Sequence, residues 1–433
     1  MLRRWRVSVL ALCLAPLAIS LPSVAGGSAL GTGRYVVVLK SSAVASDVAG
    51  TATGLGGTID HLFGTVDTLV VSLPRLHLGI LQHDPRVAYV TPDLPVQLLA
   101  GRTPAALPAV PTGVARIGAA PALNPDGTIA VATSPARKAA VALLDTGIMN
   151  RPDLNVVGGY DCSSSSGGST ADTNGHGTHV AGIVADKGIP GVIGVSPGTP
   201  LYAVRVFDAN GSGSTSAVIC GLDWVAKNAA ADNIKVVNMS LGGEGSDDGN
   251  CGNTDQDPLH TVVCRVTGAG VTVVAAAGND GADMANSAPA AYAEVLAVTA
   301  MADFDGKPGG LVSSSPCDGR EQDDTAASFS DYAVPGSADA NHTIAGPGVC
   351  ITSTWNDGGT QTISGTSMAS PHVAGLVARC IDAGPCAGLA PARIIAKLRA
   401  DAAARPADQG FLGDTSHPVA GKYYGNLADD TGY

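Results

Sequence analysis

The chain has few charged and few aromatic side chains for its length. Of its 433 residues, 14% are charged and 4% are aromatic, whereas 45% are hydrophobic. Disordered proteins combine low hydrophobicity with high charge, so this composition excludes a disordered chain. Basic residues are also scarce, because 25 Lys and Arg stand against 37 Asp and Glu, a net charge of −12. Nucleic-acid binding draws its affinity from neutralised phosphates, so the charge balance argues against it.

Long hydrophobic runs are missing after the N-terminus. Three arginines within the first six residues precede an apolar stretch over residues 7–21, and small residues follow up to Ala25. This order is typical of a secretory signal that is cleaved near Ala25. A membrane anchor needs about 20 apolar residues, and this stretch is shorter and interrupted by Pro16. The sequence therefore predicts a secreted, extracellular protein without a membrane span.

The sequence contains no Cys-x-x-Cys pair, which disfavours a zinc site. Nine cysteines are present, and loss of Cys13 with the signal leaves an even set, which favours disulfides in an exported chain. Eight cysteines allow on the order of a hundred pairings. Proximity along the chain favours Cys251–Cys264, Cys317–Cys350 and Cys380–Cys386, which leaves Cys162–Cys220 by elimination.

The length suffices for two or three domains of roughly 100–200 residues each. Residues 34–98 contain β-branched runs and helical stretches in the order β-α-β-β-α-β, which predicts a small ferredoxin-like α+β module. Residues 100–113 are rich in Pro, Gly and Ala and lack periodicity, so we expect an exposed linker. In the module we predict strands at 35–39, 58–63, 65–73 and 87–90, with a second helical stretch at 74–83.

From about residue 114 short apolar strands alternate with helices. Continuous Val, Ala and Ile runs separated by helices predict an α/β fold, in which helices cover both faces of a parallel sheet. The predicted strands are 139–144, 201–207, 235–239, 271–275 and 295–299, and the predicted helices are 176–185, 215–231, 259–267, 366–383 and 391–402.

Three short motifs lie at the ends of these elements. Asp145-Thr146-Gly147 ends a strand, a segment with the sequence NGHGTHVAG around His176 opens a helix, and the segment GTSMASP around Ser367 opens another. In open α/β sheets, ligands bind beyond the carboxyl ends of the strands, where helices begin. We therefore expect Asp145, His176 and Ser367 to meet in one cleft.

Asp, His and Ser in one cleft are the side chains of nucleophilic acyl transfer. A serine hydroxyl is a poor nucleophile and needs a base within hydrogen-bond reach. Histidine, with an ordinary pKa of about 6.5, suits this role, and a carboxylate on its far nitrogen fixes the tautomer. At a helix start, Ser367 also brings a backbone N–H to the developing oxyanion. The amide of Asn279, which follows a buried strand, could donate a second hydrogen bond.

With these motifs in this order, the sequence resembles the subtilisin-like serine proteases (subtilases), nearer the proteinase K branch in segments 279–292 and 352–375. Residues 34–98 resemble the inhibitory propeptide of the family, and residues from about 107 to 402 resemble its catalytic domain. The resemblance implies that Asp145 orients His176, that His176 is the general base, that Ser367 is the nucleophile and that Asn279 is the oxyanion donor.

The resemblance also implies how substrate binds. Two segments, Ser240-Leu241-Gly242 and Ala276-Ala277-Gly278, resemble the strands that sandwich an extended peptide and wall the pocket for the residue before the scissile bond. Small residues there leave a roomy apolar pocket, so we expect broad specificity. The function implied is that of a secreted serine endopeptidase, which hydrolyses extended polypeptides through an acyl-enzyme intermediate.

The expected division is a signal peptide at 1–25, a propeptide at 26–106 and a catalytic domain at 107–433. As a propeptide, the N-terminal module would assist folding and then inhibit its own enzyme, with its tail near Gln97–Arg102 in the cleft. The chain would then be an autoprocessed zymogen with a mature start near 104–108. A permanent second domain is the alternative for residues 34–98.

Other classes of protein are weaker alternatives. A second Asp-Thr-Gly at Asp430 would suit an aspartic protease, but it lies too near the C-terminus for a flanking strand. An α/β-hydrolase esterase would use Ser367, Asp401 and His417, yet it needs glycine where Ala369 stands and leaves the first two motifs without a role. A silent peptide-binding pseudo-protease is not favoured, because all four catalytic positions carry the required residues.

No cofactor is expected for the chemistry. His176 and His179 lack the glutamate and the spacing of a zinc protease, so His179 is interpreted as a packed helix residue. Structural calcium occurs in the family, and hard cations need several oxygen ligands. No EF-hand spacing is present, and a solvated acidic loop is the favoured interpretation of the dense carboxylates Asp303, Asp305, Asp323 and Asp324.

Overall fold

The computed structural model describes most of the chain. The described residues are 31–40, 45–63, 66–99, 101–102, 111–120, 139–164, 168–188, 192–313, 315–317, 319–430 and 432–433. The predicted signal at 1–25 and the predicted mature start at 104–108 lie outside them.

A parallel sheet forms the centre of the main domain. Its strand order is β16-β15-β13-β11-β7-β9-β8, with β17 beside β15. Neighbouring strands run parallel, except that β16 is antiparallel to β15. The strands are β7 (Ala140–Asp145), β8 (Val156–Asp161), β9 (Leu201–Arg205), β11 (Ile234–Met239), β13 (Thr272–Ala276), β15 (Val295–Ala302), β16 (Thr325–Ala326) and β17 (Thr343–Pro347).

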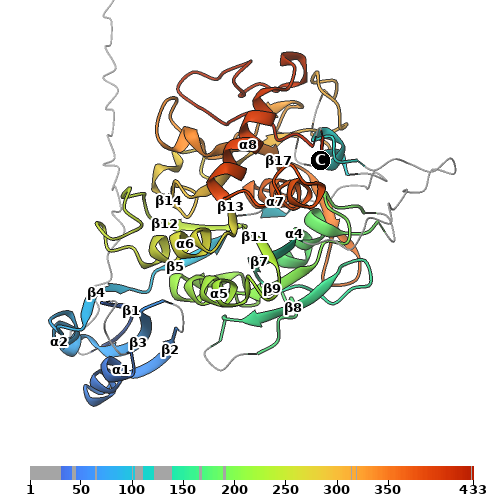
Figure 1. Ribbon diagram of the computed structural model, residues 1–433. Coiled ribbons are helices and arrows are strands. Elements are labelled where there is room, and N and C mark those ends of the chain that lie inside the picture. Colours follow the sequence, from blue (N-terminus) through green and yellow to red (C-terminus); the bar gives the residue numbers. More distant parts are fainter. Residues whose placement is uncertain are drawn as a thin grey trace, which may run out of the picture.

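Helices cover both faces of this sheet, which confirms the predicted α/β fold (Figure 1). One face carries α4 (His176–Ala185), α7 (Thr366–Ala383) and α8 (Pro391–Ala403), and the other carries α5 (Thr215–Asn228) and α6 (Pro258–Gly268). Along β7, Val141 and Leu143 pack with the first group, whereas Ala142 and Leu144 pack with the second. Because both faces are buried, the strand is apolar up to its last residue, Asp145.

The N-terminal module has the order β-α-β-β-α-β that its sequence predicts. Its antiparallel sheet has the order β2-β3-β1-β4. Val37 and Val71 face the helices of the module, whereas Val36 and Val70 join the core around α5 and α6. The elements are β1 (Thr32–Leu39), α1 (Ala45–Gly54), β2 (Thr58–Leu62), β3 (Thr68–Pro74), a 3-10 turn (Arg75–His77), α2 (Leu78–Gln82) and β4 (Val87–Pro92).

The chain leaves this module across the carboxyl edge of the main sheet. There β5 (Pro95–Leu98) lies antiparallel between β10 (Ser212–Ser214) and β12 (Leu241–Glu244). The next strand, β6 (Gly101–Arg102), pairs with β19 (Thr360–Ser364). The remaining elements are α3 (Thr112–Arg116), β14 (Ser287–Ala288), β18 (Ile351–Thr354) and three 3-10 turns at Met284–Asn286, Asp339–Asn341 and Ala407–Gln409.

Helix α5 and strand β8 are two of the elements that differ from the sequence prediction. Helix α5 ends at Asn228 rather than at residue 231, because the chain turns there and reaches Asn233 with a positive φ of 51°. Strand β8 was not predicted, since it lies at the sheet edge and contains Gly158 and Gly159, which carry no strand pattern. In the described part of the chain, no helix has the length and apolar composition to cross a membrane.

All four predicted disulfides are present. Their Cα–Cα distances run from 5.1 to 5.9 Å, and the pairs are Cys162–Cys220, Cys251–Cys264, Cys317–Cys350 and Cys380–Cys386. Cys162 follows β8 and Cys220 lies in α5, so this bridge ties the sheet edge to a covering helix. Cys380 and Cys386 close the C-terminal end of α7.

Three of the four carboxylates in the loop 303–324 are buried, which corrects the expectation that all of them are solvated; Asp305 is half-buried. Asp303, Asp323 and Asp324 are 1%, 5% and 7% exposed. The guanidinium of Arg116, itself 2% exposed, donates to Asp324 Oδ1 at 2.7 and 2.9 Å, and its Nε lies 3.5 Å from Asp303 Oδ1. Arg116 precedes Asp324 by 208 residues, so local sequence gave no sign of this counter-charge.

Replacing Arg116 by Met should lower the free energy of unfolding by about 3–5 kcal/mol, because the buried carboxylates lose their counter-charge. Denaturant unfolding measures this effect, with every variant made in the Ser367→Ala chain to exclude self-digestion. Arg34→Met is the matched control, since Arg34 pairs with Asp60 while 46% exposed and should cost less than about 1 kcal/mol. Adding Asp324→Asn to Arg116→Met should restore part of the loss. An Arg116→Met protein as stable as its parent would contradict this account.

Candidate functional site

The three motif residues lie where strands end and helices begin. Asp145 is the last residue of β7, His176 is the first residue of α4, and Ser367 is the second residue of α7. Each is buried, with at most 3% of its surface exposed. The parallel sheet therefore brings these ends to one edge of the domain, as its topology predicts.

Asp145 and His176 form a buried pair. The Nδ1–H of His176 donates to Asp145 Oδ1 at 2.7 Å, and the backbone N–H of Thr146 donates to the same oxygen at 2.7 Å. Asp145 Oδ2 and His176 Nε2 are buried and have no hydrogen-bond partner among the described residues. The carboxylate thus fixes the tautomer and leaves Nε2 free to accept a proton.

Ser367 is held by a buried polar network. Its Oγ–H donates to the carbonyl of Ser240 at 2.9 Å, and the hydroxyl of Ser240 donates back to the carbonyl of Ser367 at 2.8 Å. The amide of Asn238 donates to Ser240 Oγ, and Ser370 Oγ donates to Asn238 Oδ1. Because every member is buried and bonded, the network fixes the backbone around Ser367.

Asn279 and Ser367 bind one carbonyl of the chain itself. The Nδ2–H of Asn279 donates to the Leu99 carbonyl at 2.5 Å, and the backbone N–H of Ser367 donates to the same oxygen at 3.3 Å. The amide oxygen of Asn279 accepts from both the N–H and the hydroxyl of Thr366, each at 2.9 Å. Thr366 therefore orients Asn279, and two donors converge on one oxygen as in an oxyanion hole.

The segment before Leu99 is bound as an extended strand. Leu98 and Gln97 pair with Leu241 and Gly242 of β12, as expected for that predicted substrate segment. On its other side β5 pairs with β10 (Ser212–Ser214), not with the predicted second segment Ala276-Ala277-Gly278. Strand β10 was not predicted, because Ser-Gly-Ser has no apolar alternation, the usual signal of a strand.

The residues Ala276, Ala277 and Gly278 instead support the oxyanion donor. All three are buried, and they lead from β13 directly to Asn279. The Gly278 carbonyl accepts a hydrogen bond from Thr366 Oγ1 at 3.2 Å.

An open cleft of about 630 Å³ lies along this strand. It is lined by Leu98, His176, Trp355 and Ile363, together with Asn174 and residues 210–213. A Cβ added to Gly242 would lie 3.0 Å from Leu99 Cδ1, so the missing side chain leaves room for Leu99.

Two further histidines are structural. His179 is fully buried, and its Nε2–H donates to the carbonyls of Ile351 and Gln361, as expected for a packed residue. Burial, followed by the nearby His176, lowers the pKa of His179 to about 3. Burial likewise lowers the pKa of His372 to about 4.

The residues of the alternative hydrolases have other partners. Asp401 accepts from Lys397 at 2.9 Å and from the Tyr433 hydroxyl, whereas the exposed His417 lies beside Asp414. Asp430 forms an ion pair with Arg379 at 2.6 Å. These pairings leave no esterase triad and no aspartic dyad among the described residues.

Comparisons with known proteins agree with this geometry. Residues 136–415 match the subtilase family. M-protease of Shouchella clausii (strain KSM-K16) is 37% identical over 311 residues, which cover 72% of this chain and 68% of that protein. Subtilisin E of Bacillus subtilis (strain 168) is 37% identical over 310 residues, covering 70% and 68%. A solved structure of a cold adapted subtilisin-like serine proteinase matches with a TM-score of 0.52 and 31% identity, over 73% of this chain and 98% of that chain.

One group of acidic side chains could hold a cation. Oxygens of Asp303, Asp305 and Asp323 lie within 4.8 Å of one another. Burial raises the pKa of Asp303 to about 8, against the opposing effect of Arg116. Calcium binds six to eight oxygens, so this group would need backbone oxygens or water as well.

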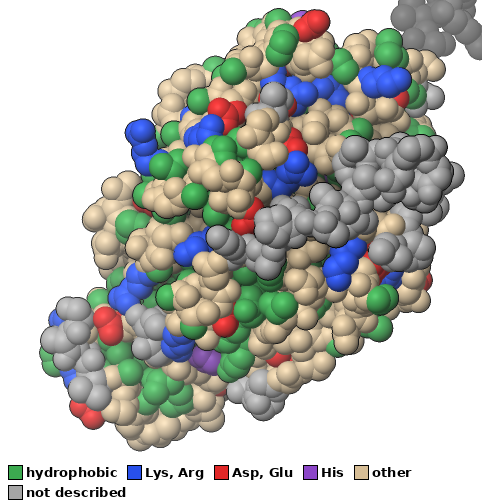
Figure 2. Space-filling view, turned by 45° about the vertical axis from the view of Figure 1, so that its right-hand side comes forward, with side chains coloured by type: hydrophobic (Ala, Val, Ile, Leu, Met, Phe, Trp, Pro, Cys, Tyr) green, Lys and Arg blue, Asp and Glu red, His purple; other side chains and the backbone are tan. Residues whose placement is uncertain are grey.

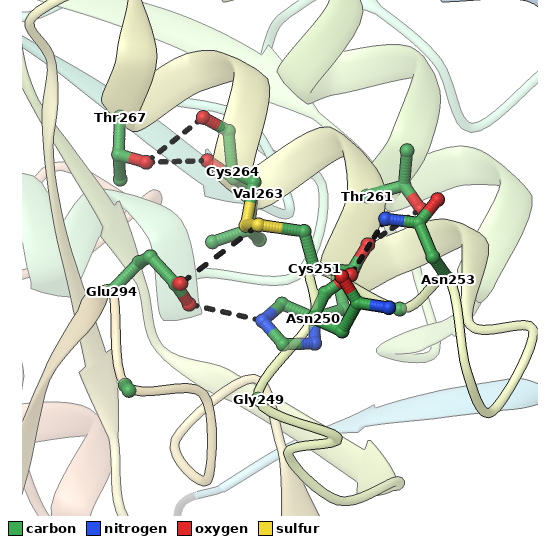
Figure 3. Close-up of a disulfide and its surroundings, with 12 residues drawn as sticks. Gly249, Asn250, Cys251, Asn253, Thr261, Val263, Cys264, Thr267 and Glu294 are labelled. Carbon is green, nitrogen blue, oxygen red and sulfur yellow. Dashed lines mark hydrogen bonds and ion pairs between the residues drawn. A yellow bond between two sulfur atoms is a disulfide. The ribbon is translucent and has the colours of Figure 1, made fainter.

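A second cluster surrounds His260, whose hydrogen-bond partner Glu294 lies beside the disulfide in Figure 3. Glu294 lies next to Cys251–Cys264, whose sulfurs are bonded to each other and so cannot act as thiolate ligands. The buried His260 donates from Nε2 to Glu294 at 2.9 Å, and its Nδ1 lies 3.5 Å from Asp248. Burial disfavours the imidazolium, but Glu294 and the neighbouring aspartates Asp247 and Asp257 outweigh it and raise the pKa of His260.

The charge on His260 should stabilise the fold in a pH-dependent way. A raised pKa means that this stabilisation is fully present below about pH 6.5 and is lost as the pH rises through the folded-state pKa. In the Ser367→Ala chain, the difference in melting temperature between His260 and His260→Gln proteins should therefore shrink from pH 6 to pH 9. His417→Gln is the control at an exposed histidine. A difference that stays constant or grows at alkaline pH would contradict the prediction.

Proposed function

We propose that Asp145, His176 and Ser367 are the catalytic triad of this chain. The proposal starts from the family, because the chain belongs to the subtilases and is a serine endopeptidase. The buried Asp145–His176 hydrogen bond supports this assignment, because it leaves Nε2 as the basic atom. Asn279 and the backbone N–H of Ser367 are the proposed oxyanion hole. Subtilases need no cofactor for this chemistry.

In the proposed mechanism His176 takes the proton of Ser367 as Oγ attacks the scissile carbonyl carbon. The imidazolium, stabilised by Asp145, then protonates the leaving amine, and water hydrolyses the acyl-enzyme with the same base. The Ser367 hydroxyl donates to Ser240 here, so it must rotate toward His176 Nε2 before attack. The Nε2 atom of His176, which would accept the hydroxyl proton, has no competing hydrogen-bond partner among the described residues.

The observation that carries the proposal is the bound Leu99 carbonyl. Its oxygen accepts from the two proposed oxyanion donors, while β5 adds a strand between β10 and β12. This is how a substrate strand binds by main-chain pairing. The carbonyl before Ala100 is therefore presented to Ser367 as a scissile carbonyl would be.

We further infer that residues 26–106 are a propeptide that inhibits the enzyme. Asp93 of the N-terminal module accepts hydrogen bonds from the N–H and hydroxyl of Ser216, at 2.8 and 2.7 Å, in the first turn of α5. Arg34 lies 3.4 Å from Asp93. A carboxylate is favourable at a helix N-terminus, so this contact anchors the module beside the cleft. The position of Leu99 favours Leu99–Ala100 as the first bond cut, upstream of the start at 104–108 predicted from spacing.

Specificity should be broad, with a preference for apolar residues. The side chain of Leu99 packs over Gly242, and Val96, three residues before it, is 5% exposed in the core beside α5 and α6. Secretion is supported by relatives such as the extracellular serine proteinase of a Thermus species, 38% identical over 315 residues. On the face in Figure 2, basic and acidic side chains are interspersed, without the continuous basic patch that is typical of nucleic-acid binding.

Parallel expression of wild-type and Ser367→Ala chains tests the reaction class. Wild type should release a fragment that ends at Leu99 and should cleave an extended peptide library, whereas Ser367→Ala should stay one chain and cleave nothing. Mass spectrometry identifies both the new termini and the cleaved library bonds. Ser416→Ala is the control, because Ser416 is an exposed serine in a loop outside the network that holds Ser367.

Three results would contradict the proposal. Library cleavage by Ser367→Ala would exclude Ser367 as the nucleophile. An active enzyme that retains its N-terminal module would make residues 34–98 a permanent domain. A correctly processed wild type without hydrolytic activity would point to a peptide-binding pseudo-protease.

A further inference from the structure

Asp172 is a buried carboxylate beside the triad that the mechanism above does not use. It is 4% exposed and accepts five hydrogen bonds. Oδ1 accepts from the hydroxyl of Thr146 at 2.9 Å and from the backbone N–H groups of Asn174 and Gly175 at 2.9 and 2.8 Å. Oδ2 accepts from the N–H of Thr178 at 2.9 Å and from its hydroxyl at 2.6 Å.

These bonds join the strand that carries Asp145 to the helix that begins with His176. Thr146, next to Asp145, donates to Asp172 and accepts from the backbone N–H of Gly177, next to His176, at 2.9 Å. The hydroxyl of Thr178, itself bonded to Asp172, accepts from the backbone N–H of Met149 at 3.0 Å. Asp172 is thus tied to both sides of the turn that follows Asp145.

The Asp145–His176 pair has little other polar support. Among the described residues, Asp145 Oδ1 accepts only from His176 and Thr146, and Oδ2 accepts from none. The approach is also tight, because a Cβ on Gly177 would lie 2.1 Å from the Gly147 carbonyl. A small rotation of the strand end against the helix would therefore change the donor–acceptor geometry of the pair.

We propose that Asp172 is a positioning residue that acts through Thr146 to hold Asp145 and His176 in register. The inference rests on the proposed triad. An ionised carboxylate suits the site because the five groups that contact it, from four residues, are all donors. Asparagine is not equivalent, since its NH₂ group would face the N–H of Thr178 or of Gly175.

The decisive variants are Thr146→Val and Thr146→Ser, which have nearly the same size and no change in charge. Thr146→Val removes the hydroxyl and should lower kcat by about 10²-fold with little change in KM, the scale of a small misplacement. The acid limb of its pH–activity profile should move to lower pH, because a displaced Asp145 stabilises the imidazolium less. Thr146→Ser keeps the hydroxyl that bonds to Asp172 and Gly177, so its kcat should stay within a few-fold of wild type. Asp172→Asn should lose at least as much as Thr146→Val.

Asp414→Asn is the matched control. Asp414 is 5% exposed and accepts from the backbone N–H groups of Phe411, Ser416 and His417 in a loop apart from the triad. Its replacement should leave both kcat and the pH profile unchanged. This comparison separates positioning of the pair from the general cost of losing a buried loop carboxylate.

A proton resonance tests the positioning role of Asp172 without relying on enzyme activity, so this test does not depend on the proposed protease function. In the Ser367→Ala chain, the low-field proton resonance of His176 Nδ1–H should shift or broaden in Thr146→Val and persist in Thr146→Ser. An unchanged resonance and wild-type kinetics in Thr146→Val would overturn the inference, as would equal losses in the two variants. An inactive wild type with the predicted resonance changes would refute the protease function and leave the positioning role standing.

Discussion

The hydrogen bond between Asp145 and His176 is the interaction on which the site depends. It joins the end of β7 to the start of α4, so its 2.7 Å distance depends on how this helix packs against this strand. Apolar packing on both faces of β7 holds that strand, with α4 and α7 on one side and α5 on the other. The low charge content of the chain agrees with a sheet that is buried on both faces. The geometry of the site therefore depends on the packing of β7 as well as on the residues of the three motifs.

The same edge explains why the N-terminal module sits where it does. The Leu99 carbonyl occupies the two donors on Asn279 and Ser367, so the chain itself takes up the proposed oxyanion hole. Strand addition by β5 and capping of α5 by Asp93 are independent contacts, one along the cleft and one beside it. Under the proposed propeptide function, these two contacts would restrain the enzyme until the intervening chain is cut.

The sequence predicted the elements whose signals are local. Continuous Val and Ala strands, the helix starts at His176 and Thr366 and the four disulfides are all present. It did not predict β8 and β10, because glycine and serine carry no strand periodicity. The burial of Asp324 was not predicted either, because its partner Arg116 lies 208 residues earlier in the sequence. Asp172 escaped notice because an aspartate before a helix looks like an ordinary cap.

A mapped covalent modification tests most directly whether the three side chains act together. The processed enzyme is treated with a fluorophosphonate, which reacts with a serine only when a neighbouring base activates it. Mass spectrometry should then find one adduct, on Ser367, with activity lost in proportion to labelling. No adduct, or an adduct on a different serine, would contradict a nucleophile activated by His176 and Asp145.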